Sequence, residues 1–177
     1  MITRHDYEQL PEGSPRYQLI AGDLVISPSP GRSHQQIVGN IHSILDRYLE
    51  VNQTGEAFLA PFDVFLSDIN VYQPDVLFIR NENLSIVTEH GIEGGPDLVI
   101  EILFPGTARF DRGSKRKVYA RTGVKELWLV DPETNRIEVF HLTEDAETPV
   151  GTYGTDSVFQ SSLLPGLEIS AARVFRR

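Results

Sequence analysis

The chain has 177 residues, of which 40% are hydrophobic and 23% are charged, a composition typical of a soluble globular domain. It contains no cysteine, which excludes disulfides, thiolate zinc sites and a cysteine nucleophile; neither a membrane span nor a signal-peptide core is visible, so we expect one cytoplasmic domain over residues 1–177. The net charge of −9 argues against an indiscriminate nucleic-acid binder, because phosphate contacts dominate such binding.

The N-terminal third predicts two helices on either side of a hairpin. Thr3 and Asp6 form a capping-box pattern for a short first helix. Residues 16–26 predict a β-hairpin, and Ser33 opens a long helix with Gln36 in the capping-box position. The apolar residues of that helix recur at helical spacing. They are Ile37, Ile41, Ile44, Leu45, Tyr48 and Leu49.

Strands dominate the middle of the chain. Residues 56–66, interrupted by a proline, and residues 71–79 form extended apolar runs. Residues 81–95 are polar and contain glycine, which predicts a loop. A third apolar run covers residues 97–103 and ends at the Pro105-Gly106 pair.

A basic helix then runs to about Thr122, with Gly123 placed as its left-handed cap. Strands follow at residues 126–130 and 136–142, and a last one lies near Val158. This order predicts an α+β fold, an α/β sandwich-like arrangement with a mixed central β-sheet flanked by helices. The unit from strand 97–103 through the helix to strand 126–130 should cross over right-handed, which makes these two strands parallel.

Two carboxylates stand at unusual places in this pattern. Asp75 follows Pro74 at the start of the apolar run 76–79, and Glu101 lies inside the strand 97–103. An ionised acid in such a strand is costly unless it is paired or bound to a cation. Two of them in consecutive strands predict a hard cation held between oxygens. The alternatives are a buried ion pair for Glu101 and a turn role for Asp75.

The basic helix concentrates positive charge on an acidic chain. Seven of the 16 Lys and Arg residues fall between positions 109 and 125, where Asp111 is the only acid. They are Arg109, Arg112, Lys115, Arg116, Lys117, Arg121 and Lys125. Such a strip could steer a polyanion despite the unfavourable total charge. A solvated helix face is the alternative interpretation.

Helical geometry separates the lysines of this segment. At about 100° per residue, Lys115 lies on the same side as Val118 and Tyr119, and Lys117 lies about 200° away from it. If Val118 and Tyr119 face the sheet, Lys115 points inward and Lys117 points outward. Phe110 complicates this assignment, because it falls on the Lys117 side.

Short motifs along the chain form an ordered set. They are Tyr17–Val25, Ser27–Pro30, His34, Gln73–Val76, Pro96–Leu103, Asp111, Lys115, Tyr119, Gly123-Val124 and Trp128–Pro132. With this set, the chain resembles the Uma-type restriction-endonuclease-like family, a branch of the PD-(D/E)xK nuclease superfamily, over nearly its whole length. The resemblance implies a restriction-endonuclease-like core with an extra N-terminal hairpin.

The resemblance also implies a catalytic set of three residues. Asp75 matches the Asp of the PD motif, and Glu101 matches the second acid. The usual lysine would fall at Leu103, and Lys115 on the following helix matches the position to which this branch moves it. Asp75, Glu101 and the backbone carbonyl of Ile102 would then bind Mg²⁺, with Mn²⁺ as the alternative ion.

Supporting residues and departures follow from the same comparison. His34, Asp111 and Tyr119 are the supporting residues; for His34, a proton carrier, a second metal ligand and a structural residue near a helix cap all stay open. Gln18 stands where the family often has Glu, and Phe104 stands where Ser is common. Either departure could mean weakened or absent catalysis.

The function predicted from the sequence is a metal-dependent DNA endonuclease. Arg112, Arg116, Lys117 and Arg121 are the candidate nucleic-acid-binding residues. A homodimer is expected as well, because cleavage of a duplex needs two active sites. The alternative is a catalytically inactive nuclease fold that acts as a nucleic-acid-binding, protein-binding or regulatory module. A two-carboxylate glycosidase fits less well, because it needs no lysine on a basic helix.

Overall fold

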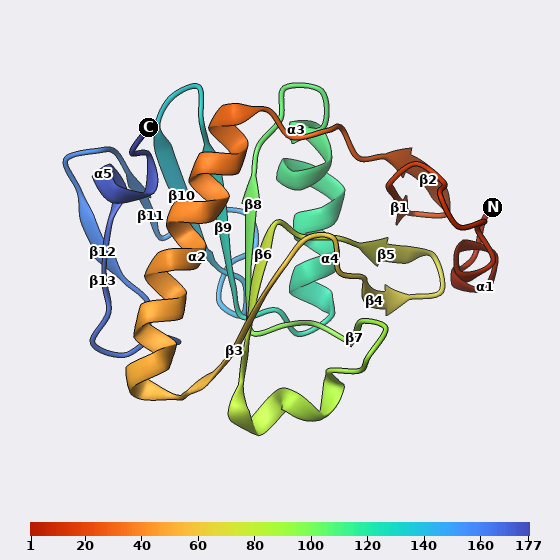
Figure 1. The fold of residues 1–177 in the computed structure, drawn as a ribbon, viewed down its shortest axis with the longest axis horizontal. Coiled ribbons are helices and arrows are strands. Elements are labelled where there is room, and N and C mark those ends of the chain that lie inside the picture. The colour runs from red at the N-terminus through yellow and green to blue at the C-terminus, as the bar shows by residue number, and fades with distance from the viewer.

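A six-stranded sheet forms the centre of the molecule in the computed structural model, which describes residues 1–177 (Figure 1). Its strand order is β11-β10-β9-β8-β6-β3, and β8 and β9 pair in parallel while their other neighbours are antiparallel. The strands are β3 (Gly55–Leu59), β6 (Val76–Arg80), β8 (Leu98–Ile102), β9 (Glu126–Asp131), β10 (Arg136–His141) and β11 (Gly151–Tyr153). The parallel pair predicted from the sequence is therefore confirmed.

A second sheet, of five strands, carries the N-terminal hairpin at the end of the molecule opposite the C-terminus (Figure 1). Its order is β2-β1-β5-β4-β7. The strands are β1 (Tyr17–Ile20), β2 (Asp23–Ile26), β4 (Val64–Ser67), β5 (Asn70–Tyr72) and β7 (Ile92–Glu93). The predicted hairpin is confirmed, and its turn places Ala21 and Gly22 at positive φ. A separate two-stranded sheet pairs β12 (Val158–Gln160) with β13 (Glu168–Ser170).

One long helix and several short helical segments surround the sheets. They are α1 (Arg4–Glu8), α2 (Arg32–Asn52), the 3₁₀ turn η1 (Asn81–Ile86), α3 (Ala108–Phe110), the π-helical turn η2 (Asp111–Lys115), α4 (Arg116–Arg121) and α5 (Ala171–Val174). The capping box of Thr3 and Asp6 is present in α1 as predicted. Gly123 has a positive φ just after α4, also as predicted. No helix combines the length and the apolarity needed to cross a membrane.

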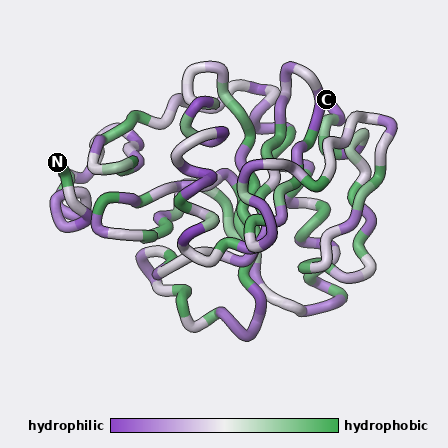
Figure 2. Tube along the Cα trace, turned by 180° about the vertical axis from the view of Figure 1, so that it is seen from behind, coloured by the Kyte–Doolittle hydropathy of each residue, from purple (hydrophilic) through white to green (hydrophobic).

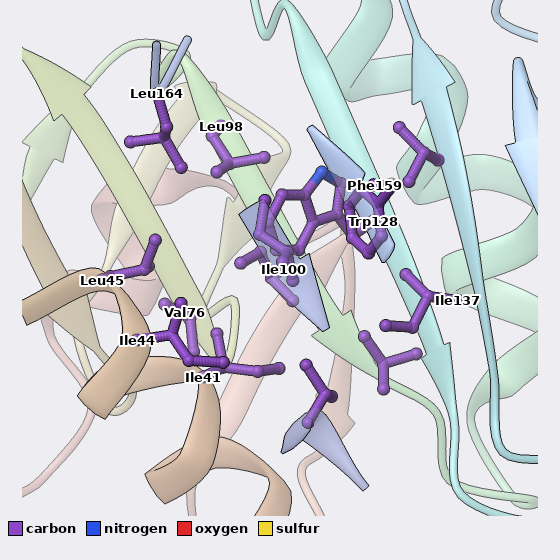
Figure 3. Close-up of a cluster of buried hydrophobic side chains, with 14 of the residues drawn as sticks. Ile41, Ile44, Leu45, Val76, Leu98, Ile100, Trp128, Ile137, Phe159 and Leu164 are labelled. Atoms are coloured by element: carbon purple, nitrogen blue, oxygen red, sulfur yellow. The ribbon is translucent and has the colours of Figure 1, made fainter. Parts of the chain in front are cut away.

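The central sheet is covered by helices on both faces. Ile41, Ile44 and Leu45 of α2 pack against Val76, Ile100 and other residues of the sheet in the larger apolar cluster (Figure 3). On the other face, Val118 and Tyr119 of α4 pack with alternate residues of the same strands, in a second cluster. The chain is most apolar through this middle and more polar along its outer loops (Figure 2).

The strand β8 shows how this two-sided burial positions the site. Leu98 and Ile100 contribute to the cluster under α2, whereas Val99 and Leu103 contribute to the cluster under α4. Because alternate residues of a strand share a face, Glu101 lies on the α4 side. The two clusters thus divide the apolar residues of β8 between the two faces of the central sheet.

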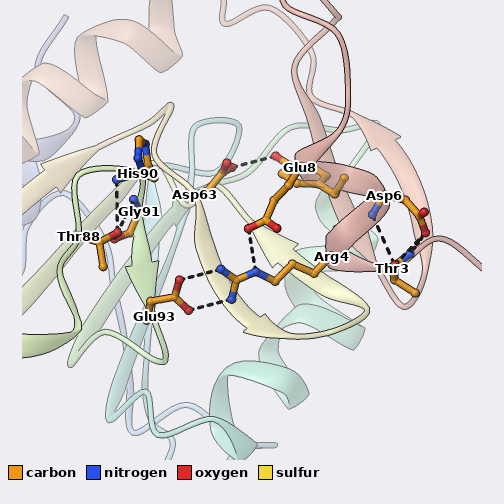
Figure 4. Close-up of polar contacts among 10 residues, drawn as sticks. Thr3, Arg4, Asp6, Glu8, Asp63, Thr88, His90, Gly91 and Glu93 are labelled. Atoms are coloured by element: carbon orange, nitrogen blue, oxygen red, sulfur yellow. Dashed lines mark hydrogen bonds and ion pairs between the residues drawn. The ribbon is translucent and has the colours of Figure 1, made fainter.

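Ion pairs attach the first helix to the second sheet. Arg4 donates from both terminal nitrogens to the carboxylate of Glu93 in β7, at 2.7 and 2.8 Å, and from Nε to Glu8 at 3.0 Å (Figure 4). All three donor groups of this guanidinium are therefore engaged within the fold.

Three sequence predictions need correction. The long helix begins at Arg32 with Gly31 as its N-cap and has no side-chain cap, so the capping box predicted from Ser33 and Gln36 is wrong. The run at residues 71–79 is two strands in two different sheets, because the chain leaves the five-stranded sheet before Pro74 and joins the central sheet at Val76. The segment 81–95 is not only loop, because it contains η1 and β7.

Candidate active site

The break between β5 and β6 places Asp75 at the junction of the two main sheets. Gln73, Pro74 and Asp75 connect a strand of the second sheet to a strand of the central sheet. Asp75 Oδ2 accepts a hydrogen bond of 2.8 Å from the backbone N–H of Ile102, at the end of β8. The strand break therefore brings the first predicted acid to the carboxyl end of the strand that carries the second.

Pro74 affects the neighbouring backbone as well. Val76 pairs with Ile100, so the antiparallel register, extended by two residues, puts Pro74 opposite Ile102. A residue in an antiparallel ladder directs its N–H and its C=O toward the same neighbouring strand. Proline has no N–H to donate, so this position of the ladder supplies no backbone donor to the Ile102 carbonyl. That carbonyl is thus suited to bind a cation beside Asp75.

Glu101 lies in β8 next to this point and is 4% exposed. Its Oε1 accepts hydrogen bonds from Lys115 Nζ at 2.5 Å and from the Tyr119 hydroxyl at 2.7 Å. Both bonds go to the same oxygen. Oε2 has no hydrogen-bond partner in the fold, and it is not fully buried. Glu101 therefore keeps one oxygen available to the cleft.

Lys115 connects Glu101 to a third acid. Its Nζ also donates to Asp111 Oδ1 at 2.8 Å, and its side chain is 3% exposed. Burial alone would lower the pKa of Lys115, but the charges of Asp111 and Glu101 and their hydrogen bonds outweigh it and raise that pKa. The lysine is therefore an ammonium ion at neutral pH and cannot serve as a base.

The π-helical turn explains how Lys115 and Phe110 both reach the cleft. Residues five apart on an α-helix lie about 140° from each other. The i→i+5 bonding of a π turn brings such residues closer in phase, and this turn covers residues 111–115. Phe110 and Lys115 therefore line the same cleft, although α-helical phase had put Phe110 on the side of Lys117. Lys115 is buried and Lys117 is exposed, as predicted.

Glu101 and Asp111 hold their protons more tightly than usual, because the pKa of each is raised. Burial, opposed by Lys115 and reinforced by the nearby charges of Asp111 and Asp75, raises the pKa of Glu101 to about 8. Burial also raises the pKa of Asp111, again against the opposing effect of Lys115. One lysine thus neutralises part of a site with three carboxylates, and the excess negative charge favours an additional cation.

His34 approaches Asp75 from the first turn of α2. Its Nε2 lies 3.1 Å from Asp75 Oδ1, but the angle is not that of a hydrogen bond, and neither ring nitrogen has a hydrogen-bond partner. The ring stacks on Phe104 with 4.6 Å between ring centroids. The contact with Asp75 is therefore close without being a hydrogen bond, and the Phe104 ring covers one face of the imidazole.

These side chains line one cleft with about 540 Å³ of empty volume, part of it open to solvent. The structure brings together most of the residues predicted from the sequence. At the cleft are Asp75, Glu101, Ile102, Lys115, His34 and Asp111, with Tyr119 behind Glu101. No group of three or more acidic or histidine side chains forms a complete metal site, so a metal here would need backbone or solvent oxygens as well.

The predicted nucleic-acid-binding residues lie outside the cleft. Arg112 pairs with Glu138, and Arg116 pairs with Glu147 at 3.2 Å. Lys117 and Arg121 are exposed and have no ion-pair partner. Two of the four predicted residues, Arg112 and Arg116, are thus already neutralised by acids of the same chain.

Sequence reasoning missed the other wall of the cleft. Arg16, Gln18 and Gln73 line it from the second sheet. The alternation of Arg16 with Gln18 along β1 could have indicated a shared face, but the sequence did not show that the hairpin would lie against Asp75.

Comparison with known proteins agrees with this architecture. A family model, Uma2, described as "Putative restriction endonuclease", matches residues 4–172. Among solved structures, the chain is similar to "a putative nuclease belonging to DUF820 from Anabaena variabilis ATCC 29413", with 21% sequence identity and a TM-score of 0.81 over 99% of this chain and 98% of that one. No curated protein matches the chain. The family resemblance and the fold class predicted from the sequence are confirmed.

Proposed function

Because the chain belongs to the Uma2 family of restriction-endonuclease-like proteins, we propose that it is a Mg²⁺-dependent endonuclease that hydrolyses phosphodiester bonds of DNA. The observation that carries the proposal is the cleft itself. Asp75, directly before β6, and Glu101, in the neighbouring β8, both line it, and the charged Lys115 donates to Glu101 at 2.5 Å. Two acids that can bind a metal ion, next to a charged lysine, suit metal-assisted phosphodiester hydrolysis.

The metal-binding atoms follow from what the fold leaves unengaged. Asp75 Oδ1, Glu101 Oε2 and the Ile102 carbonyl would hold Mg²⁺, with Mn²⁺ as the alternative ion, because hard cations prefer such oxygens. When bound, the ion polarises a phosphoryl oxygen and lowers the pKa of its water. Burial, together with the charges of Asp111 and Asp75, raises the pKa of Glu101 despite Lys115, and a carboxylate destabilised in this way gains from a further cation.

Lys115 would act as a fixed positive charge. Its raised pKa keeps it protonated, and Glu101 and Asp111 each accept one of its three N–H groups. The remaining N–H can orient the attacking water and stabilise the negative charge that develops on the phosphorane. Tyr119 holds Glu101 from the protein side, so the carboxylate keeps Oε2 toward the cleft.

Lys117 and Arg121 would contribute attraction at longer range. Both are exposed on the outer side of α4 and free of acids, so they add positive potential near an otherwise acidic protein. A homodimer, in which two copies cut the two strands of a duplex, is part of the same proposal.

One observation favours a second candidate function. Glu101 is already paired with Lys115, as a purely structural buried ion pair would be, and Gln18 rather than an acid faces the cleft. A catalytically inactive module that binds nucleic acid or protein would have this arrangement without needing a metal.

A plasmid-nicking assay tests the proposal. Supercoiled DNA is incubated with the protein and Mg²⁺ or Mn²⁺, next to the Glu101→Gln variant, which keeps the shape of the side chain and removes its charge. We expect metal-dependent nicking by the wild type and none by the variant. Binding without nicking by both proteins, under both ions, would favour the inactive module.

A further inference from the structure

Arg16 occupies the wall of the cleft that belongs to the N-terminal hairpin. It precedes β1 and pairs with Ser27, whose N–H donates to the Arg16 carbonyl at 2.7 Å. Because alternate residues of a strand share a face, Arg16 lies on the same side as Gln18 and Ile20. All three line the cleft that contains Asp75.

The Arg16 guanidinium is anchored at one nitrogen and free at the other two. Its Nε donates to Gln73 Oε1 at 3.0 Å, its two terminal nitrogens make no hydrogen bond, and no acid lies within ion-pair distance. Arg4 offers the opposite case, with all three donor groups occupied by Glu8 and Glu93 (Figure 4). Terminal nitrogens presented side by side are the fork that binds a phosphate in bidentate fashion.

Gln73 relates this fork to the predicted metal-binding acid. Its backbone N–H donates to Gln18 Oε1 at 2.9 Å, and its Nε2 donates to Asp63 Oδ1 at 2.8 Å. With its Oε1 occupied by Arg16, both its side chain and its backbone are fixed. Gln73 lies two residues before Asp75, so the position of the guanidinium is set relative to the catalytic cleft.

The charge of the cleft points to the same role. Among the residues that line it, Lys115 and Arg16 are the only Lys or Arg side chains, and Lys115 is bound to Glu101 and Asp111. A polyanion that enters a cleft with three carboxylates, on a protein of net charge −9, needs a positive group that is not already neutralised. Arg16 is that group.

We propose that Arg16 binds a backbone phosphate of the nucleic-acid strand next to the phosphate that is hydrolysed, and that Gln73 is the positioning residue that orients it. The inference rests on the proposed nuclease function. It makes the N-terminal hairpin part of the substrate-binding site rather than an addition to the nuclease core.

Binding measurements in a non-cleaving Glu101→Gln background test this role. Fluorescence anisotropy compares Arg16→Ala with Arg47→Ala, which removes an exposed arginine of α2 remote from the cleft. Loss of a charge-assisted bidentate contact should weaken binding of a DNA oligonucleotide about 10- to 100-fold. Arg47→Ala should stay within about twofold. Arg16→Lys should recover little, because one ammonium group cannot reproduce the fork and also donate to Gln73.

Oligonucleotides with a single uncharged methylphosphonate locate the contact. After wild-type cleavage sites are mapped, each phosphate around the cut is replaced in turn. In the Glu101→Gln protein, methylphosphonate at one phosphate beside the cut should weaken DNA binding by the same factor as Arg16→Ala does. In the Glu101→Gln protein that also carries Arg16→Ala, the same methylphosphonate should weaken binding no further. Arg16→Gln, which retains a donor for Gln73, repeats the measurement with the hairpin held in place.

The outcomes separate this inference from the function on which it rests. A wild type that cleaves DNA, with Arg16→Ala and Arg47→Ala indistinguishable at every phosphate, would overturn the role of Arg16 and leave the nuclease standing. Full recovery by Arg16→Lys would also overturn it, because any positive charge would then suffice. A wild type that neither binds nor cleaves nucleic acid would overturn both.

Discussion

The two ends of β8 each hold a buried acid next to a lysine, yet they are built differently. At the start, Asp97 accepts from Arg80 N–H, Asn83 Nδ2 and Lys125 Nζ, so both of its oxygens are engaged. Burial alone would raise the pKa of Asp97, but these hydrogen bonds outweigh it and lower that pKa. At the other end, Glu101 uses one oxygen, and its pKa is raised to about 8.

The lysines paired with these two acids differ in how far they are buried. The side chain of Lys125 is 40% exposed, whereas that of Lys115 is 3% exposed and shared between Glu101 and Asp111. Asp97 is therefore a satisfied structural acid that attaches η1 and the start of β9 to the sheet. Glu101 is an incompletely satisfied acid with one oxygen free of hydrogen bonds, as the proposed metal site requires.

The largest expected difference between the two acids is in the pH dependence of stability. Glu101 has a folded-state pKa of about 8 against an ordinary value of 4.5, so its contribution is fully favourable below pH 4.5 and is lost as the pH rises through 8. The full shift corresponds to an upper limit of about 5 kcal/mol. Glu101→Gln mimics the protonated acid, so in EDTA its free energy of unfolding in urea should match that of wild type at about pH 4 and exceed it at pH 9.

Asp97 should behave in the opposite way. Its lowered pKa gives a stabilisation that is present above pH 3.8 and is lost as the pH falls through its folded-state value. The free energy of unfolding of wild type minus that of Asp97→Asn should therefore shrink as the pH falls below 3.8. The same difference for Glu101→Gln should instead fall as the pH rises from 4.5 to about 8. The same pH profile for both differences would end the distinction between the two acids.

Removal of the buried lysine should have the next largest effect. Lys115→Met keeps much of the side-chain volume and removes the charge, and we expect about a 100- to 1,000-fold loss of nicking rate with little loss of DNA binding, because the charge acts on the transition state. Lys117→Ala is the matched control on the exposed side of the helix. Equal kinetic effects from both variants would show that the buried lysine has no special role.

Truncation of Asp97, at the start of β8, should lower the stability of the fold and leave the rate of DNA nicking unchanged. Asp97→Ala removes bonds to Arg80, Asn83 and Lys125, and should lower the free energy of unfolding by about 2–3 kcal/mol, since Lys125 can return to water. Urea unfolding measures this loss, and nicking is then compared per folded molecule. A lower rate per folded molecule would mean that the two ends of β8 are coupled.

The smallest effect is expected on the outer face of α4. Lys117→Ala should weaken DNA binding a few-fold, uniformly across sequences, and reduce the slope of log K against log salt by about one unit. Arg112→Ala should change that slope less, because Glu138 already neutralises Arg112. A salt titration of binding for both variants checks this order, and the reverse order would place the nucleic acid over the start of the helix.

The sequence predicted those features that local patterns encode. Alternation along residues 97–103 places Glu101 on the same face as Val99 and Leu103, and helical phase assigned Lys115 to the inside. What it missed depends on contacts between distant segments. The approach of Arg16 to Gln73 joins residues 57 positions apart, and the π turn that brings Phe110 to the cleft does not follow from the helical periodicity of the sequence. The incorrect helix cap at Ser33 shows the limit of a local pattern, since Gly31 starts the helix without any side-chain bond.

The most direct test of the account is the effect of Mg²⁺ on the unfolding free energy of wild type, Glu101→Gln and Asp97→Asn at one pH. An ion that binds only the folded protein stabilises it by mass action. We predict that saturating Mg²⁺ stabilises wild type and Asp97→Asn by equal amounts and leaves Glu101→Gln unchanged. If wild type ignores Mg²⁺ and Glu101→Gln is strongly destabilised in EDTA, Glu101 is a structural acid like Asp97, and the account is contradicted.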